Sequence, residues 1–502
     1  MSKRLVHTHT HKLSTSNISR NMTANSRLST NYRNPKRVSF SNTPTTGLYL
    51  PPFFSTLNTM TLSKGSEFIN VKPVTYPTSY KSAVDKLANI ELSEEQLLLK
   101  DKILGFVRNQ LHTYKKGDKS SLFVIQGDAG TGKSVILNAL FNEIQRIAKK
   151  GDDSDVLYGK QNYLVVNHPE MLKLYHRIAA SFDYLAKKDL ERPTSLINRL
   201  TKEKKTCDVV IVDEAHLLAT SKNGFKRFFG DNHLEELMKL AKVLIIVYDD
   251  KQSLRMDQYW SSDGKNGSSL DSYLTQAKYF DIYNLQQQFR VAASKDVQDW
   301  IYEISTSKKI LPLPTQDLVK RMSGDEDAFE FKIWDDCLEM YQCLQEKDKE
   351  YGQCRMLSTY DFPYRIGNKD WFVTCGDFKL RWDRFAPTNR KPWSERPDTI
   401  EEVGSVYTIQ GFDLNYAGVI LGRSIAYDEK TDSIKILPEY YDDHAGFTRR
   451  KNIVSADSVK EKIILNSINV LLTRGVRGLY IYAWDEKLRA RLNRLSTDAG
   501  LA

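Results

Sequence analysis

Cysteine is scarce in this 502-residue chain, and no two cysteines have the C-x-x-C spacing of a zinc site. There are five cysteines, an odd number, which also argues against a disulfide framework. Long apolar runs are missing as well, and none approaches the roughly 18 residues that a membrane span needs. We therefore expect the protein to reside in a reducing compartment, the cytoplasm, and to have no membrane partner.

Acidic residues are missing from residues 1–66, which carry nine lysines and arginines. The remaining 64 of the 73 basic residues nearly balance the 63 acidic residues, so bulk charge gives no evidence of nucleic-acid binding by the rest of the chain. Residues 1–80 are rich in Ser, Thr and Asn and have little periodicity, so we expect a disordered tail. Two alternatives are a targeting segment and a translation start at Met22 or Met60.

A phosphate-binding loop is predicted within residues 122–134, which read LFVIQGDAGTGKS. Residues 122–126 have the apolar character of a buried strand, the pattern G-x-x-x-x-G-K-S follows, and residues 135–147 have helical apolar spacing. In this context the glycines let backbone N–H groups point at phosphate oxygens, and the helix N-terminus adds partial positive charge. The predicted loop residues are Gly127, Asp128, Ala129, Gly130, Thr131, Gly132, Lys133 and Ser134.

Carboxylates follow a second predicted strand, in residues 207–216, which read CDVVIVDEAH. Asp213 and Glu214 come directly after four β-branched residues, at the strand end where open α/β sheets bind ligands. They lie 80 residues after Lys133 (213 − 133). We expect Ser134 and Asp213 to hold Mg²⁺, Lys133 to reach the β- and γ-phosphates of ATP, and Glu214 to polarise the attacking water.

Further strands are predicted at residues 163–166, 241–247 and 281–285, with helical stretches between them, which indicates a parallel α/β sheet. Gln252 follows one of these strands and is a candidate sensor of the γ-phosphate. Residues 371–393 are aromatic and basic. That composition fits base stacking, and it fits equally a pair of strands that bury aromatic side chains, which we favour slightly.

Together these motifs resemble, in their order, the superfamily 1 helicases, and more closely the Schlafen group 3-like DNA/RNA helicase domain. The likeness covers about residues 90–490. Its C-terminal part is carried by EVGSVYTIQGFDLNYAGVILG at 402–422, AYD at 426–428 and NVLLTRGVRGLYIY at 469–482.

The resemblance implies an α/β fold with two RecA-like P-loop lobes, parallel sheets flanked by helices, and ATP bound between the lobes. The first lobe would span residues 81–284. The second would span residues 285–502, with an inserted and mainly helical segment at about 291–353.

The resemblance also implies roles for residues outside the phosphate loop. Gln96 would read adenine, Asp413 would lie near the ribose, and Arg290 and Arg474 would act as arginine fingers. The residues that would contact nucleic acid or couple it to ATP are Asn167, His168, His216, Thr408, Gln410 and Gly411.

Three functions are compatible with these features. The first is an ATP-driven translocase or helicase on single-stranded DNA or RNA. The second is an ATPase switch that nucleic acid or a protein partner regulates, for example in a defence or stress system, without duplex unwinding. The third is a phosphate-loop kinase, which the two arginines and the T-x-Q-G element of a second lobe disfavour. We expect nucleic-acid-stimulated ATPase activity more firmly than strand separation.

Overall fold

The structure is a computed structural model, and the tail expected over residues 1–80 lies outside the part it describes. The described residues fall in a single compact unit, Pro73–Ala502. None of the helices described is long and apolar enough to cross a membrane. The described ranges are 91–127, 130–224, 227–261, 267–285, 293–364, 369–383, 391–448, 450–451 and 453–499.

The first sheet has six parallel strands in the order β3-β2-β4-β5-β1-β6. The phosphate-loop strand β1 therefore lies between β5 and β6, and β5 separates it from β4, the strand that carries the carboxylates. The strands are β1 Ser121–Gln126, β2 Asn162–Val166, β3 Leu190–Glu191, β4 Cys207–Asp213, β5 Ala241–Tyr248 and β6 Phe280–Asn284.

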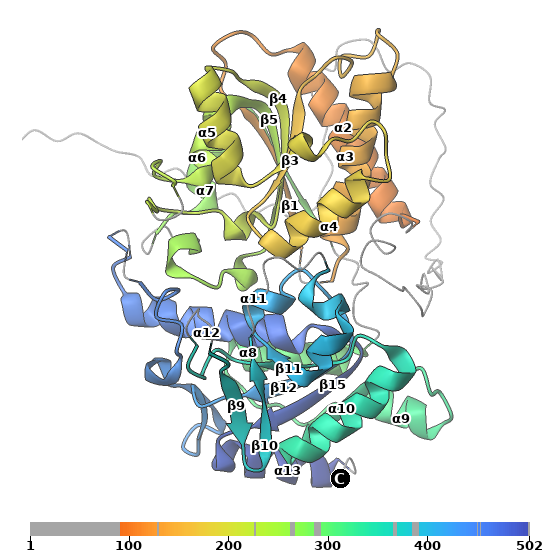
Figure 1. The fold of residues 1–502 in the computed structure, drawn as a ribbon, viewed down its shortest axis with the longest axis vertical. Helices are drawn as coiled ribbons and strands as arrows, with labels where there is room; N and C mark the ends of the chain where they lie inside the picture. Colours follow the sequence, from red (N-terminus) through yellow and green to blue (C-terminus); the bar gives the residue numbers. More distant parts are fainter. Residues whose placement is uncertain are drawn as a thin grey trace, which may run out of the picture. The chain divides into compact units, whose positions relative to one another are not determined.

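Helices cover both faces of this sheet (Figure 1). Alternation along β1 explains the two layers, because Phe123 and Ile125 pack in one core cluster while Leu122 and Val124 pack in another. α2, α3 and α4 contribute to the first cluster, and α5, α6 and α7 contribute to the second. The helices are α2 Glu94–His112, α3 Lys133–Lys150, α4 Pro169–Ala179, α5 Pro193–Glu203, α6 His233–Leu240 and α7 Leu270–Leu274.

The second sheet has seven strands in the order β7-β15-β12-β8-β11-β10-β9. All neighbouring pairs are parallel except β9 and β10, which form an antiparallel pair at one edge. β13 Ile425–Asp428 and β14 Ser433–Ile436 pair separately. The strands of the sheet are β7 Glu330–Trp334, β8 Arg355–Ser358, β9 Phe372–Cys375, β10 Phe378–Trp382, β11 Glu402–Gly404, β12 Leu414–Leu421 and β15 Gly475–Ala483.

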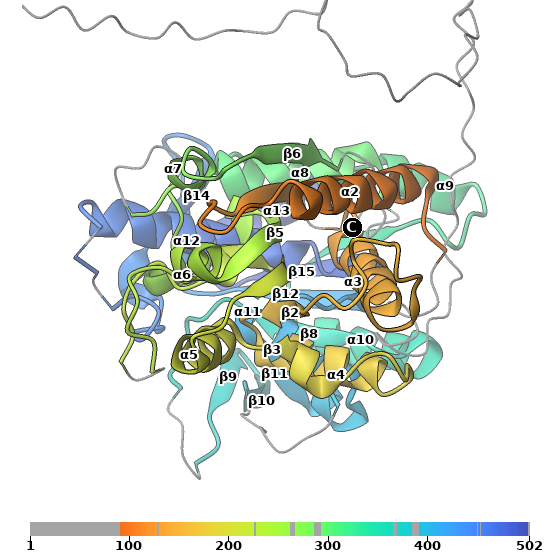
Figure 2. The ribbon, with the colours of Figure 1, turned by 90° about the horizontal axis from the view of Figure 1, so that it is seen from above.

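Residues 291–353, which we expected as an inserted helical segment, include three helices and the strand β7 among their described residues. β7 pairs with β15 at the sheet edge, and α10 packs over β12 and β8. In the views of Figures 1 and 2, α10 lies beside these strands. The helices of this half are α8 Lys295–Thr306, α9 Gln316–Met322, α10 Cys337–Tyr351, α11 Val406–Ile409, α12 Ala456–Leu472 and α13 Glu486–Asp498.

Two α/β parallel sheets of the RecA-like kind therefore confirm the fold class predicted from the sequence.

Short polar side chains fix where several helices begin. Asp336 and Asp485 accept hydrogen bonds from the first-turn N–H groups of α10 and α13, at 2.9 and 2.8 Å. Such caps satisfy donors that have no partner within the helix.

The close approach of β15 to its neighbours makes Gly478 a test of this packing. A Cβ atom there would lie 2.4 Å from the Tyr416 ring and 2.9 Å from the Glu330 carbonyl oxygen. We expect Gly478→Ala to lower the free energy of unfolding by about 1–3 kcal/mol through overpacking. Denaturant unfolding of the purified protein measures this effect.

Gly105→Ala on α2 is the matched control, because nothing lies within 4 Å of a Cβ built at that position. Replacing a helical glycine by alanine stabilises a helix by up to about 1 kcal/mol. Equal unfolding midpoints for the two variants would contradict the packing described for β15.

Candidate nucleotide site at the ends of β1, β4 and β5

The candidate site forms where three neighbouring parallel strands end. Gln126 at the end of β1 is in register with Tyr248 of β5, and Val212 of β4 is in register with Ile246. The carboxyl ends of these strands therefore meet at one edge of the sheet, where α/β folds bind ligands. This edge carries the phosphate loop, the residues Asp213 and Glu214, and the segment that begins at Asp249.

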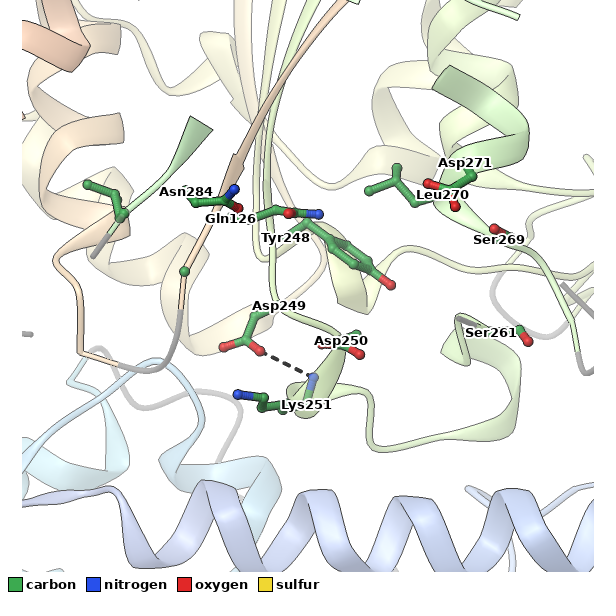
Figure 3. Close-up of a pocket in the computed structure, with 12 residues that line it drawn as sticks. Gln126, Tyr248, Asp249, Asp250, Lys251, Ser261, Ser269, Leu270, Asp271 and Asn284 are labelled. Carbon is green, nitrogen blue, oxygen red and sulfur yellow. Dashed lines mark hydrogen bonds between the residues drawn. The ribbon is translucent and has the colours of Figure 1, made fainter. Parts of the chain in front are cut away.

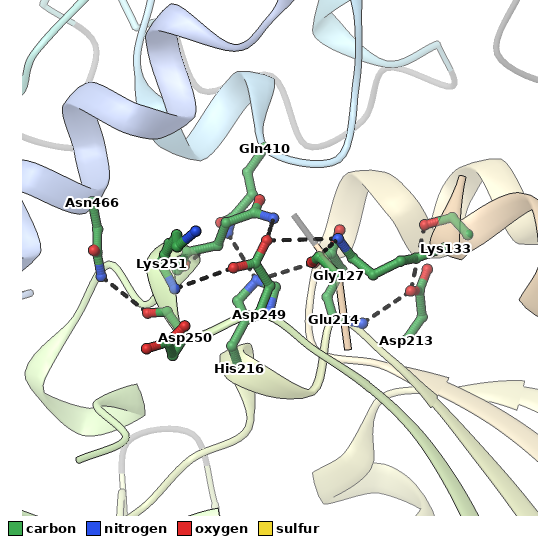
Figure 4. Close-up of polar contacts among 12 residues, drawn as sticks. Gly127, Lys133, Asp213, Glu214, His216, Asp249, Asp250, Lys251, Gln410 and Asn466 are labelled. Atoms are coloured by element: carbon green, nitrogen blue, oxygen red, sulfur yellow. Dashed lines mark hydrogen bonds and ion pairs between the residues drawn. The ribbon is translucent and has the colours of Figure 1, made fainter. Parts of the chain in front are cut away.

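The Lys133 ammonium lies at the centre of this edge. Lys133 is the first residue of α3 and is 7% exposed. Nζ donates to the Gly127 carbonyl oxygen at 2.7 Å and lies 3.6 Å from Asp249 Oδ2 (Figure 4). Gly130 and Gly132 have φ values of 92° and 73°, which favour glycine and let the loop turn into the helix. Asp128 and Ala129 of the predicted loop lie outside the described residues.

Asp213 and Ser134 supply the oxygen atoms that fit a magnesium ion. Ser134 Oγ lies 3.4 Å from Asp213 Oδ1, which also accepts the Glu214 N–H at 3.0 Å. Burial raises the pKa of the Asp213 carboxyl, and the charge of Glu214 raises it further. Mg²⁺ prefers hard oxygen ligands and takes few of them from the protein, leaving other positions to phosphate and water. The donor set therefore fits Mg²⁺.

Glu214 belongs to a chain of polar contacts that crosses to the second sheet. Its Oε2 lies 3.0 Å from Nε2 of His216, and the Nε2 atoms of His216 and Gln410 are 3.3 Å apart. Gln410 also donates to the backbone carbonyl of Gln252 at 3.1 Å, and the Gln252 side chain donates to Asp249 at 2.6 Å. Figure 4 shows Gln410 reaching from the second-sheet side towards His216 and Asp249. The structure thus brings Lys133 and Glu214 into one connected network with Gln252, His216 and Gln410.

Residues expected to contact nucleic acid are engaged by protein groups. Asn167 donates to the Leu217 carbonyl at 2.6 Å and accepts from Arg192 at 3.2 Å. His168 caps α4, is 6% exposed, and has Nε2 3.2 Å from the Tyr407 carbonyl oxygen. Burial lowers the pKa of His168 to about 4, so the ring is neutral at pH 7.

Two expected coupling residues shape the turn that carries Gln410. Thr408 Oγ1 accepts from the Ser405 N–H at 2.9 Å in the capping box of α11. Gly411 has φ of 85°, and a Cβ atom there would lie 2.7 Å from Met171 Sδ of α4. This turn therefore packs closely against the first-sheet helix that His168 begins.

The remaining predicted residues lie outside this network in different ways. Gln96 is buried at the start of α2, where its Oε1 accepts from the Ser93 N–H at 3.0 Å, and its Nε2 has no hydrogen-bond partner among the described residues. Asp413 is half-buried just before β12. Arg474 is fully buried, and its guanidinium donates to the Val470 carbonyl at 2.6 Å and the Phe412 carbonyl at 3.3 Å. Arg290 lies outside the described residues.

Two residues of the site were given no role of their own from the sequence. Asp249 contacts Lys133, and the rule that polar residues gather after parallel strands applies to it, because it directly follows β5. Tyr175 of α4 donates to Asp213 Oδ2 at 2.6 Å. In the sequence it is one apolar-face residue of an amphipathic helix, and no local pattern distinguishes it.

A pocket of about 410 Å³ adjoins the phosphate loop where β1, β5 and β6 end, opposite the start of α7 (Figure 3). Asp249, Asp250 and Asp271 bring three carboxylates to its lining. Lys251 also lines the pocket, and Asp249 pairs with Lys133, so the lining holds charges of both signs.

The aromatic and basic segment divides by strand alternation. Val373, Cys375, Phe378 and Trp382 of the β9–β10 pair are buried, as in the strand reading that we favoured slightly. Phe372 is instead 42% exposed, and the Lys379 ammonium lies 4.7 Å from its ring centroid. One face of the pair therefore belongs to the core, and the other presents an aromatic ring beside a cation.

Comparisons with known proteins cover most of the chain. The family described as Schlafen group 3, DNA/RNA helicase domain matches residues 120–485. The Uncharacterized protein YPL245W of Saccharomyces cerevisiae (strain ATCC 204508 / S288c) is 60% identical over 430 residues, which are 84% of this chain and 94% of the yeast protein.

Two solved structures align with lower similarity. A DEAD box protein from the hyperthermophile Methanococcus jannaschii is 10% identical, with a TM-score of 0.28, over 82% of this chain and 97% of that chain. A structure of Pif1 helicases at forked double-stranded DNA is 10% identical, with a TM-score of 0.29, over 82% and 98%.

The burial of Arg474 generates a prediction about stability. Arg474→Ala removes a fully buried side chain and leaves the carbonyl groups of Val470 and Phe412 without this donor. We expect the free energy of unfolding to fall by about 3 kcal/mol, from the cavity and the lost hydrogen bonds. The control is Arg146→Ala, because Arg146 pairs with Glu143 on an exposed surface of α3. If both variants unfolded at the wild-type denaturant concentration, the buried contacts of Arg474 would contribute nothing to stability.

Proposed function

This chain belongs to the Schlafen group 3 DNA/RNA helicase domain family, and from that membership we propose that it is an ATP-dependent translocase or helicase on single-stranded DNA or RNA. One observation carries the proposal: Lys133, Ser134, Asp213 and Glu214 meet at one strand-end edge of the first sheet. A cation, two magnesium-fitting oxygens and a candidate base at one place are the groups that ATP hydrolysis requires.

In the proposed reaction, backbone N–H groups of the phosphate loop hold the phosphates, and the Lys133 ammonium exchanges its contact with Gly127 for a γ-phosphate oxygen. Glu214 accepts a proton from the attacking water, and Nε2 of His216 lies 3.0 Å from Oε2 of that carboxylate. Mg²⁺ held by Ser134 and Asp213 would offset the negative charge of the phosphate oxygens. Gln252 is positioned through Asp249 to sense the γ-phosphate.

We assign the remaining predicted roles within the same proposal. The Gln96 Nε2 group is a buried donor with no partner in the described part of the chain, which supports the adenine-reading role. Asp413 stays a candidate ribose contact. Arg290 and Arg474 are the candidate arginine fingers, and Arg474 must leave its carbonyl partners at Val470 and Phe412 to reach a phosphate.

Glu214→Gln separates nucleotide binding from turnover. The substitution keeps the shape of the side chain and removes its capacity to accept a proton, so we expect ATP hydrolysis to fall by about a thousandfold. ATP affinity, measured with a fluorescent ATP analogue, should stay near the wild-type value, whereas Lys133→Ala should abolish hydrolysis.

Glu235→Gln on α6 is the matched control, because Glu235 is partly exposed and pairs only with Lys239 among the ion pairs described. That variant should hydrolyse ATP at the wild-type rate. Full turnover by Glu214→Gln would remove Glu214 from the reaction.

A second candidate function is an ATPase switch, regulated by nucleic acid or by a protein partner, that unwinds no duplex. It is favoured by the protein contacts of Asn167 and His168, the residues expected to touch a nucleic-acid backbone. In this alternative the same hydrolysis site works, and the conformational change that follows is read by the partner.

ATP hydrolysis by the purified full-length protein, alone and with single-stranded DNA, single-stranded RNA or duplex added, distinguishes the two functions. For a translocase we expect one single-stranded polymer to raise the turnover rate. The stimulation should also weaken with salt, because phosphate contacts release counterions. Turnover that no polymer alters would contradict the translocase and favour the switch.

A further inference from the structure

Tyr175 lies at the candidate nucleotide site although no motif assigns it a role. It belongs to α4, is 2% exposed, and packs in the core cluster that covers one face of the first sheet. Its phenol oxygen lies 2.6 Å from Asp213 Oδ2, the shortest side-chain contact that the structure gives to that carboxylate among the described residues. The two residues are 38 positions apart in the sequence, so the contact exists only in the folded chain.

The two carboxylate oxygens of Asp213 have different partners. Oδ2 accepts the Tyr175 hydroxyl, while Oδ1 accepts the Glu214 N–H at 3.0 Å and faces Ser134 Oγ at 3.4 Å. Because the phenol occupies Oδ2 from the core side, it fixes the rotation of the carboxylate about its last bond. Oδ1 is thereby held beside Ser134, the other magnesium-fitting oxygen.

We propose that Tyr175 is a positioning residue that holds Asp213 in the orientation that binds Mg²⁺ together with Ser134. The inference rests on the proposed function, because it needs the edge of β1 and β4 to be a nucleotide–magnesium site. A buried carboxylate oxygen without a donor is unfavourable, and the phenol supplies that donor without adding charge. Hydrogen-bond partners of metal-ligating groups tune metal affinity, and their loss typically weakens it about 10- to 100-fold.

An ordinary buried tyrosine that merely satisfies its hydroxyl is the competing explanation. Tyr480 provides the comparison, since its hydroxyl donates to Glu330 at 2.7 Å. This contact joins two strands of the second sheet, β15 and β7, and involves no residue of the candidate site. A phenol–carboxylate contact can therefore be purely structural, and only a readout that depends on Mg²⁺ separates the two explanations.

The test is Tyr175→Phe in the full-length chain, with a fluorescent ADP analogue titrated at a series of Mg²⁺ concentrations. Phenylalanine keeps the ring in the core and removes only the donor. We expect the Mg²⁺ concentration for half-maximal nucleotide binding to rise about tenfold. Binding of the analogue in EDTA should be unchanged, and saturating Mg²⁺ should restore both nucleotide binding and the ATP turnover rate.

Tyr480→Phe is the control and should leave the Mg²⁺ dependence at the wild-type value. A wild-type Mg²⁺ dependence in Tyr175→Phe would overturn the inference while leaving the proposed function intact. A Tyr175→Phe defect that saturating Mg²⁺ does not restore would also overturn it, because the defect would then be one of folding. Wild-type protein that binds no nucleotide at any Mg²⁺ concentration would overturn the proposed function and this inference with it.

Discussion

Burial of charge at one edge of the first sheet is the constraint on which the rest of the structure depends. Lys133, Asp213 and Glu214 are each at most 7% exposed. An unpaired charge in such a place costs several kcal/mol, so each group must meet a partner. The parallel order of β1, β5 and β4 brings these partners within a few ångströms because their carboxyl ends coincide. The contacts of these charged side chains therefore hold the loops that follow the strands.

Local pattern was enough to predict the parts of this site that adjoin strand ends. The strand–loop–helix order predicts Lys133 and Ser134 at the start of a helix, and the run of β-branched residues predicts Asp213 and Glu214 at a strand end. The structure has α3 begin at Lys133 and β4 end at Asp213, while the roles of the four residues stay proposals. The family resemblance is confirmed by the match over residues 120–485. Tyr175 could not be predicted, because its partner lies on another element and its own position looks like core.

The burial of Arg474 and His168 could not be predicted from the sequence either. Arg474 was expected to face a nucleotide, and the structure buries it against the Val470 carbonyl of its own segment and the Phe412 carbonyl, 62 positions away. His168 was expected to face nucleic acid, and its partner is the Tyr407 carbonyl, 239 positions away. Motif position identifies which residues gather near a site. It does not identify which hydrogen bonds they make in one conformation, since that depends on how distant segments pack.

Gln410 joins the two sheets through buried hydrogen bonds. Its carboxamide is 2% exposed and finds its partners, the Gln252 carbonyl and His216, on the first-sheet side of the network. Asn466 of α12 donates to the Asp250 and Ser253 carbonyls in the same way, at 3.3 and 2.8 Å. Moving the second sheet away would exchange these hydrogen bonds for hydrogen bonds to water, at a net cost of about 0.5–1.5 kcal/mol for each. Gln252 is common to both ends of the network, because its side chain donates to Asp249, the partner of Lys133, and its backbone carbonyl accepts from Gln410. The contacts between the two sheets are therefore continuous with those of the phosphate loop.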